Sequence, residues 1–324
     1  MMIGAYYTQT IYVFAKLAIA DELRDGALRA RDLATRLDVD ARNLERVMRA
    51  ATTIGLLTET DDERFELTAL GQLLREDAPG SVRSFAIYQG EDWHWRADGR
   101  LIDGVRTGRS AFDIAHGSDL YEFLDRNPDA DAVFGAAMAG FASQSRILAT
   151  AGYDFSGLDT LVDVGGGEGA VLMAILRANP GLSGVVFDRP QVIEVGVRRI
   201  AEAGLAERCK AIGGNFFVEV PPGRDAYMLS MTICDHTDPV ASRILANVRS
   251  AIRSGGRLLL LEMVVPPPNQ PSFATLGDVE VLVTTNGHVR SEAELRELLE
   301  NSGFEMTQVI PSLAPLSIIE ARPI

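Results

Sequence analysis

Apolar residues recur at helical spacing through residues 1–90, and a short hairpin pattern closes this region. The segment ARNLERVMRAATTIGLL places Leu44, Val47, Met48 and Ala51 at helical spacing, and Asp40 stands where a helix N-cap is expected. The next segment, LLTETDDERFELT, predicts two short strands joined by a turn at its acidic centre. Helices followed by a two-stranded wing are typical of a winged-helix module, which serves either DNA binding or dimerisation and packing.

From residue 159 the pattern changes to short apolar runs separated by helical stretches. The runs are TLVDV, GVVFD, AYMLS and RLLLLEM, and this alternation predicts a parallel sheet with crossover helices. Near the C-terminus two strand-like runs are joined by a link too short for a crossover helix, so the last pair is expected to be antiparallel. We predict an α/β fold with a Rossmann-like sheet of seven strands in residues 151–324.

Residues 91–150 are mostly helical in pattern and rich in aromatic side chains and methionine. We predict that they form a helical linker between an N-terminal domain, residues 1–90, and a catalytic domain, residues 151–324.

The charge of the chain changes the interpretation of the winged-helix pattern. The 324 residues carry a formal net charge of −14, with a pI near 4.8. Such a charge repels phosphate backbones and anionic membrane surfaces. We therefore expect the N-terminal module to serve dimerisation rather than DNA binding, and we expect no nucleic-acid or membrane partner.

The N-terminal segment and the cysteines indicate a compartment. The first apolar stretch lacks a basic n-region and is interrupted by charges, so it predicts an amphipathic helix rather than a signal peptide. No apolar run has the length needed to cross a bilayer. Because Cys209 and Cys234 are the only cysteines and a chain of this size needs no disulfide, a cytoplasmic location is expected.

The strongest local signal is LVDVGGGEGAVLMAIL, a strand followed by a glycine-rich turn and a helix. The glycines from Gly165 to Gly169 allow positive φ angles and let a ligand approach the backbone closely. They follow Asp163 at the carboxyl end of a strand, where open α/β sheets bind ligands. Asp188 ends the next strand about 20 residues later, which is the usual place for a carboxylate that binds ribose hydroxyls.

Three features of this loop favour S-adenosyl-L-methionine over NAD. The run GGGEG is too compressed for the dinucleotide fingerprint, it lies mid-chain behind a helical domain, and the sheet ends in a hairpin-like pair. Asp163 is a candidate contact for the methionyl amine, directly or through water. The alternative is a tight strand–helix turn that binds no ligand.

Together these segments resemble a known family. The segments DVGGGEG, VVFDRPQVI, IGGNFF, DAYMLSMTICDHTD and GHVRSEAELRELLENSGF are similar to the caffeic-acid-type and acetylserotonin-type O-methyltransferases. The similarity covers nearly the whole chain and extends especially to bacterial members that tailor polyketides, phenazines and similar aromatic natural products. It implies a homodimeric enzyme of secondary metabolism that uses S-adenosyl-L-methionine and releases S-adenosyl-L-homocysteine.

The resemblance implies a role for each cofactor-binding position. Contacts to the methionine part come from Gly165, Gly166 and Gly167. Asp188 holds the ribose, and Asn215 and Phe216 flank the adenine, with Asn215 where the family usually has Asp. Ser230 stands where the family often has Lys near the cofactor.

The resemblance also implies an aromatic acceptor roofed by the helical segment 91–150. The candidates, for which plain core packing is the alternative, are Trp93, Trp95, Met138 and Phe141. Asp278, in the C-terminal half, is a further candidate for contact with the acceptor.

The chain departs from the family where the general base is expected. The family pattern is Lys-His-x-Leu-His-Asp-Trp, in which the second His takes the acceptor proton. Here Cys234 stands at that position, Asp235 matches the family Asp, and His236 replaces the Trp. Glu262 matches the first of two acids that orient the base, whereas Val289 replaces the second.

Several interpretations of this cluster remain open. Cys234 is either a base with a stabilised thiolate or a small inert residue at a strand end, and we favour the inert residue. His236 is the alternative base. A metal site is not expected, because the candidate ligands lack a second cluster; they are Cys234, Asp235, His236 and Asp238.

Methyl transfer does not require a strong base. Holding the acceptor oxygen in line with the methyl carbon supplies on the order of 7–11 kcal/mol of the barrier. We predict an O-methyltransferase that relies on positioning and takes an intrinsically acidic hydroxyl. The alternatives are a diverged enzyme that binds the same cofactor for hydroxylation, decarboxylation or a pericyclic step, and a winged-helix DNA-binding protein.

Overall fold

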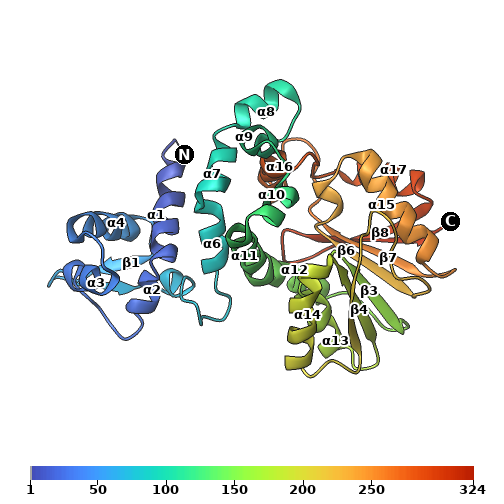
Figure 1. Ribbon diagram of the computed structural model, residues 1–324, viewed down its shortest axis with the longest axis horizontal. Coiled ribbons are helices and arrows are strands. Elements are labelled where there is room, and N and C mark those ends of the chain that lie inside the picture. The colour runs from blue at the N-terminus through green and yellow to red at the C-terminus, as the bar shows by residue number, and fades with distance from the viewer. Residues whose placement is uncertain (1) are drawn as a thin grey trace. The chain divides into compact units, whose positions relative to one another are not determined.

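The computed structural model describes residues 2–324, apart from the side chain of Phe141, and divides into two compact units (Figure 1). The first unit comprises the residues up to 96 and residues 124–142, and the second comprises residues 97–123 and 143–324. The predicted helical linker therefore contributes helices to both units.

The first unit is mainly helical, with one two-stranded sheet. Its elements are α1 (Gly4–Lys16), α2 (Ile19–Glu22), α3 (Ala30–Leu37), α4 (Ala41–Thr53), β1 (Leu57–Glu59), β2 (Phe65–Leu67), α5 (Ala69–Gln72), α6 (Arg83–Gly90), most of α7 (Asp92–Asp98), the end of α10 (Leu120–Arg126), α11 (Pro128–Ala137) and the π-helical turn η1 (Met138–Ala142). The Asp40 carboxylate accepts a hydrogen bond from the Asn43 amide at 2.8 Å, which confirms the predicted N-cap of α4. The predicted hairpin is also present, because β1 and β2 pair antiparallel.

The core of the first unit explains why these short elements hold together. Phe14, Leu33, Met48 and Phe65 are at most 1% exposed and belong to one apolar cluster. That cluster joins α1, α3 and α4 to the hairpin, so the helical face read from the sequence is the buried face. The winged-helix label for this arrangement stays a prediction.

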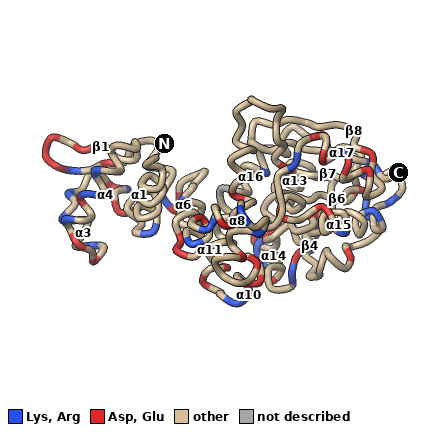
Figure 2. The backbone as a smooth tube through the Cα atoms, turned by 90° about the horizontal axis from the view of Figure 1, so that it is seen from above, with Lys and Arg blue, Asp and Glu red and all other residues tan. Residues whose placement is uncertain are grey.

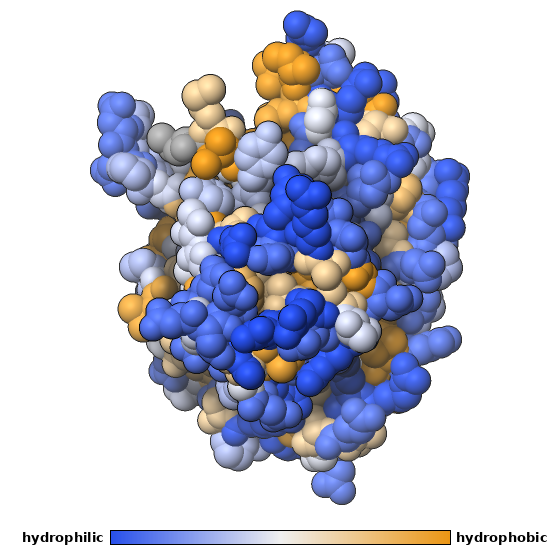
Figure 3. All heavy atoms as spheres, turned by 90° about the vertical axis from the view of Figure 1, so that its left-hand side faces the viewer, coloured by the Kyte–Doolittle hydropathy of each residue, from blue (hydrophilic) through white to orange (hydrophobic). Residues whose placement is uncertain are grey.

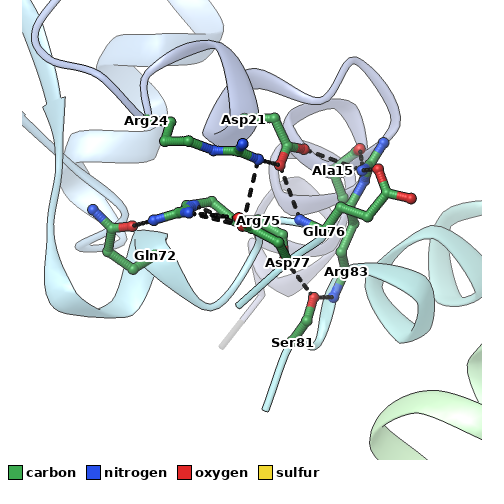
Figure 4. Close-up of polar contacts among 9 residues, drawn as sticks. All are labelled: Ala15, Asp21, Arg24, Gln72, Arg75, Glu76, Asp77, Ser81 and Arg83. Carbon is green, nitrogen blue, oxygen red and sulfur yellow. Dashed lines mark hydrogen bonds and ion pairs between the residues drawn. The ribbon is translucent and has the colours of Figure 1, made fainter. Parts of the chain in front are cut away.

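Polar contacts tie α2 to the segment before α6 (Figure 4). Asp21 accepts hydrogen bonds from the Glu76 amide at 2.9 Å and from the Arg83 guanidinium at 3.1 Å. Arg83 also donates to the carbonyl of Ala15, near the end of α1, at 3.1 Å. The side chains of Arg83 and Asp21 are only 20% and 19% exposed, so solvent screens this ion pair less than an ordinary surface pair, which contributes about 0–1 kcal/mol.

The second unit is built on a seven-stranded sheet. Its strands are β3 (Thr160–Val164), β4 (Ser183–Asp188), β5 (Cys209–Gly213), β6 (Ala226–Ser230), β7 (Arg257–Glu262), β8 (Phe304–Pro311) and β9 (Ser317–Pro323). They lie in the order β5-β4-β3-β6-β7-β9-β8. The first five are parallel, whereas β9 runs antiparallel to both β7 and β8. The predicted fold, including the antiparallel last pair, is confirmed.

Helices cover both faces of this sheet (Figure 1). The helical elements are α8 (Leu101–Thr107), α9 (Ala111–His116), the start of α10, α12 (Ser143–Thr150), α13 (Ala170–Ala178), α14 (Pro190–Glu202), the 3₁₀ turn η2 (Ile233–Asp235), α15 (Asp238–Ala251), α16 (Phe273–Thr284) and α17 (Glu292–Asn301). Leu172 of α13 and Ile193 of α14 pack in one core cluster, and Ile244 of α15 and Leu298 of α17 pack in the other. These two apolar layers fix the sheet and hold its carboxyl edge in place.

Charged residues of both signs are distributed along both units (Figure 2). No helix within residues 2–324 combines the length and the apolar character needed to cross a membrane.

Candidate active site

Four parallel strands of the second unit end at one edge of the sheet. β4, β3, β6 and β7 are neighbours in that order. Their last residues, Asp188, Val164, Ser230 and Glu262, therefore lie along the same edge. The chain passes from β3 to β4 on one side, while β6 lies on the other side of β3. Ligands of open α/β sheets bind at such a reversal of strand order.

The glycine loop after β3 presents bare backbone at this point. Gly165, Gly167 and Gly169 have φ angles of 72°, 58° and 85°, which disfavour residues with a side chain. A Cβ on Gly166 would lie 2.7 Å from the Asp163 carboxyl carbon. A Cβ on Gly165 would lie 3.2 Å from the Thr232 hydroxyl, in the segment after β6. The loop therefore lies against that segment, and a ligand can approach its backbone closely.

Asp188 is held by backbone donors on both of its oxygens. The Gly167 amide donates to Oδ2 at 2.8 Å, and the Arg189 amide donates to Oδ1 at 2.7 Å. Burial raises the pKa of Asp188, and these two hydrogen bonds oppose that shift. Each carboxylate oxygen can accept a second hydrogen bond, so a ligand hydroxyl can still bind here.

Several buried polar atoms have no hydrogen-bond partner among the described residues, and two of them belong to strand ends next to the loop. These two are Oδ1 of Asp163, which is 1% exposed, and Oγ of Ser230, which is 6% exposed. Burial raises the pKa of Asp163 to about 7, the positive charge of Arg146 opposes this, and the negative charge of Asp188 adds to it. Unsatisfied buried groups are rare in proteins, and these two fit the polar groups of a ligand, a cationic amine above all.

The segment after β5 reaches the same loop. The Cε1 atom of Phe216 lies 3.7 Å from the position of a Cβ on Gly165. The Asn215 side chain accepts a hydrogen bond from the Phe217 amide at 2.9 Å, and Asn247 donates to the Phe216 carbonyl at 2.8 Å. These contacts place the aromatic ring of Phe216 beside the glycine loop, and contact of Asn215 and Phe216 with the adenine stays a prediction.

The segment after β6 carries Cys234 in a buried position. The Cys234 side chain is 3% exposed, and Glu262 of β7 accepts a hydrogen bond from the neighbouring Ile233 amide at 3.0 Å. Burial raises the pKa of the Cys234 thiol well above its usual value, and the acids Glu262 and Asp235 raise it further. A thiol with such a pKa is protonated at neutral pH, so it is a poor base.

His236 is a neutral side chain in an aromatic setting. Its ring centroid lies 5.3 Å from that of Phe217 and 6.2 Å from that of Phe216. Burial lowers the pKa of His236 to about 4, Arg290 lowers it as well, and Asp119 acts in the opposite direction. At neutral pH this imidazole is uncharged and a weak base.

Arg290 holds the segment from Ile233 to Asp238 in place, a role that we did not predict from the sequence. Its guanidinium is 2% exposed. It donates to the carbonyls of Ile233 and His236, both at 2.9 Å, and to one oxygen of Asp238 at 2.7 and 2.9 Å. The planar, forked donor set of arginine is suited to such a multiple contact.

Comparison with known proteins identifies the kind of site. Residues 99–305 match the model of the O-methyltransferase domain, and residues 1–77 match that of the O-methyltransferase dimerisation domain. The chain belongs to this O-methyltransferase family. It is an enzyme whose cofactor is S-adenosyl-L-methionine.

Individual relatives align over almost their whole length. A phenazine O-methyltransferase of Lysobacter antibioticus is 40% identical over 100% of this chain and 95% of the relative. A mitomycin biosynthesis 6-O-methyltransferase of Streptomyces lavendulae is 34% identical over 98% of this chain and 92% of the relative. Both are enzymes of natural-product methylation.

Solved structures agree with this assignment. The structure of LaPhzM has a TM-score of 0.96 at 40% identity and covers 100% of this chain and 97% of its own. An O-methyltransferase from neocarzinostatin biosynthesis, in complex with S-adenosylmethionine and 2-hydroxy-5-methyl naphthoic acid, has a TM-score of 0.84 at 30% identity, covering 98% of this chain and 96% of its own.

The residues predicted to contact the acceptor are not brought together within one unit of this methyltransferase. Trp93, Trp95 and Met138 belong to the first unit, whereas the cofactor-binding candidates belong to the second. The side chain of Phe141 lies outside what the structure describes. The Asp278 carboxylate accepts a hydrogen bond from the Val289 amide at 2.7 Å, so this oxygen fixes the segment after α16. Acceptor contact by these residues stays a prediction.

Proposed function

We propose that this enzyme transfers the methyl group of S-adenosyl-L-methionine to an acidic hydroxyl of an aromatic natural product. The observation that supports the proposal most strongly is the pairing of a bare glycine loop with the unsatisfied buried atoms of Asp163 and Ser230. The relatives named above act, by their names, on phenazine and mitomycin compounds, and a neighbouring structure contains a hydroxylated naphthoic acid. A phenolic or similarly acidic hydroxyl on a fused ring system fits all of these.

In this proposal, different residues at the carboxyl edge of the sheet bind different parts of the cofactor. The bound cofactor supplies an electrophilic methyl group on a sulfonium. Asp163 and Ser230 bind its amino-acid part against the glycine loop, Asp188 accepts hydrogen bonds from the ribose, and Asn215 and Phe216 contact the adenine. Each of these groups lies at the end of a parallel strand or in the segment after it.

Catalysis in this proposal depends mainly on positioning, and neither Cys234 nor His236 serves as the base. The thiol of Cys234 is protonated at neutral pH, and the pKa of His236 is lowered to about 4 by burial. Val289, which replaces the second acid of the family, packs with Cys234 in one apolar cluster. Cys234 and Val289, which replace a histidine and an acid of the family, therefore lie in the same apolar cluster.

The homodimer belongs to the same proposal. The chain carries the dimerisation domain of the family, and α1 with the residue before it exposes large side chains that are apolar or aromatic. Ile3 is 51%, Tyr6 72% and Tyr7 42% exposed, and exposed apolar surface of this kind usually marks an interface. The view in Figure 3 shows hydrophobic patches within a largely hydrophilic surface.

A direct assay tests the function. The purified protein is incubated with S-adenosyl-L-methionine and a panel of hydroxylated phenazines, naphthoates and polyketide phenols, and the products are analysed by mass spectrometry. A gain of one methyl group with an equal amount of S-adenosyl-L-homocysteine supports the proposal. Conversion of an acceptor that requires the cofactor but leaves it intact would instead identify the diverged, non-methylating enzyme.

The variant Cys234→Ala is expected to retain methyl transfer within about tenfold of the parent enzyme. A general base contributes roughly 10²–10⁴-fold to a rate, whereas a buried, protonated thiol contributes only packing. The measurement is kcat with a saturating acceptor, beside the Kd for S-adenosyl-L-homocysteine. A loss of several orders of magnitude with an unchanged Kd would show that the thiol is the base.

Cofactor binding is expected to tighten as the pH rises from 6 to 8. The cationic amine of S-adenosyl-L-homocysteine favours the ionised form of Asp163, whose pKa is raised to about 7 by burial, with Arg146 and Asp188 as its charged neighbours. Below this pKa a proton must leave on binding, so the Kd rises by up to about tenfold per pH unit. Calorimetric titration across this range measures the slope.

Two variants make this pH test specific. Asp163→Asn is expected to bind more weakly and with a flat pH dependence between pH 6 and 8. Asp154→Asn, which removes an exposed carboxylate of the same unit, is expected to keep the parent slope. An unchanged slope in Asp163→Asn would mean that another group takes up the proton.

A further inference from the structure

Asp235 is hydrogen-bonded to a tyrosine more than one hundred residues away in the sequence. The Tyr121 hydroxyl, on α10, donates to Oδ2 of Asp235 at 2.6 Å. The other oxygen of Asp235 faces the Cys234 sulfur at 3.8 Å. Both residues belong to the second unit, which also contains the carboxyl edge of the sheet.

This pair is largely buried but more accessible than the thiol. Tyr121 and Asp235 are both partly exposed, and Cys234 is buried. The guanidinium of Arg189 lies 5.8 Å from the centre of the Tyr121 ring, and the Arg189 amide donates to Asp188. The negative charge of Asp188 also contributes to the raised pKa of Tyr121, so Tyr121 lies within electrostatic range of the carboxylate proposed to hold the ribose.

The charges around the pair suit proton acceptance at neutral pH. The groups that act on Asp235 are Tyr121, Arg146 and Cys234, with Glu262 of β7 as a further acid nearby. Burial raises the pKa of Asp235 to about 6, and burial raises the pKa of Tyr121 well above its usual value. At neutral pH the tyrosine is thus a phenol and the aspartate is mostly ionised.

We propose that Tyr121 and Asp235 act together as the proton acceptor for the hydroxyl that is methylated. This inference rests on the proposed function. As the acceptor oxygen forms its bond to the methyl carbon, the hydroxyl proton passes to Oη of Tyr121, and the Tyr121 proton passes to Oδ2 of Asp235. The electron pair of the broken carbon–sulfur bond stays on sulfur, and the proton on Asp235 later leaves to solvent.

The test uses three variants of the full-length enzyme. Tyr121→Phe removes the relay hydroxyl, and Asp235→Asn keeps the side-chain shape but cannot take the proton. Tyr153→Phe is the matched control, because Tyr153 donates to the carboxylate of Glu320 in β9 of the same unit, outside the proposed site.

The first measurement is independent of turnover. A monohydroxyphenazine is bound in the presence of S-adenosyl-L-homocysteine, and its phenolate absorbance is recorded at pH 7. The parent enzyme and Tyr153→Phe are expected to show less phenolate than Asp235→Asn, because an ionised carboxylate near the bound hydroxyl disfavours a second negative charge. If Tyr121→Phe does not fold, as judged by its Kd for S-adenosyl-L-homocysteine, Asp235→Asn alone decides the outcome.

The second measurement is kcat with S-adenosyl-L-methionine. Both site variants are expected to lose about 10²-fold or more, the range of general-base contributions, with little change in cofactor affinity. Parent-like kcat in both variants, with parent-like phenolate absorbance in Asp235→Asn, would overturn the relay. A parent enzyme that methylates no compound of the aromatic panel would instead overturn the proposed function, so the two failures are distinguishable.

Discussion

Replacing Gly287 by alanine is expected to lower methyl transfer by about 100-fold or more. A Cβ at this position would lie 2.0 Å from the carbonyl oxygen of Cys234, 2.4 Å from the carbonyl carbon of Asp235 and 2.4 Å from the amide nitrogen of His236. All three atoms are backbone, so no side-chain rotation can relieve the overlap. The segment that carries the proposed proton acceptor must therefore shift, and a misplacement of about 1 Å can cost roughly 10²-fold in rate.

The same substitution is expected to destabilise the fold by about 1–3 kcal/mol, the usual cost of overpacking. The matched control is Gly181→Ala, at an exposed position where a Cβ meets no atom within 4 Å and φ is not positive. Thermal unfolding and kcat are measured for both variants. Parent-like activity in Gly287→Ala would mean that the geometry of this segment does not limit the reaction.

The order of apolar runs and helical stretches along the sequence predicts most of this fold. The alternation of apolar runs and helices predicts the parallel sheet, and the short final link predicts the antiparallel pair β8 and β9, because both follow from local chain length and burial. β5 is harder to recognise, since Cys209 is its only buried residue. An edge strand with one buried position does not show the apolar run by which a strand is predicted from sequence.

The glycine loop and Asp188 are also recognisable from sequence, because a strand, a turn and a helix lie in one short segment. The contacts of Tyr121 with Asp235 and of Arg290 with His236 are different, since they join residues 114 and 54 positions apart. Only the folding of α10 and of the segment after α16 against the residues that follow β6 brings them together. The one local hint is the sequence GHVRS, where Gly287 and Arg290 flank the replaced acid position.

The variant Arg290→Met is the other change for which we expect a large effect. Methionine approximates the length of arginine but donates no hydrogen bond, so the carbonyls of Ile233 and His236 and the Asp238 carboxylate lose their donor. An unsatisfied buried group costs about 1–3 kcal/mol. Asp238 is 64% exposed and water can replace its partner, so we expect a total destabilisation of about 2–5 kcal/mol, mainly from the two carbonyls.

This variant also has a readout that a general loss of stability would not produce. The charge of Arg290 contributes to the low pKa of His236, which burial lowers first. Removing that charge is expected to raise the pKa of His236 from about 4, as measured by NMR titration of the imidazole. A histidine with a higher pKa would be partly charged in acid solution and pack less well beside Phe217.

The control for Arg290→Met is Arg296→Met, on the exposed face of α17. Arg296 is 45% exposed and pairs with Glu292 at 2.9 Å, a surface pair that contributes about 0.3–0.5 kcal/mol. Arg290→Met should therefore lower both thermal stability and kcat much more than Arg296→Met does. Equal effects of the two variants, or an unchanged His236 titration, would contradict the role of Arg290 in positioning this segment, because its buried donors and its charge both act there.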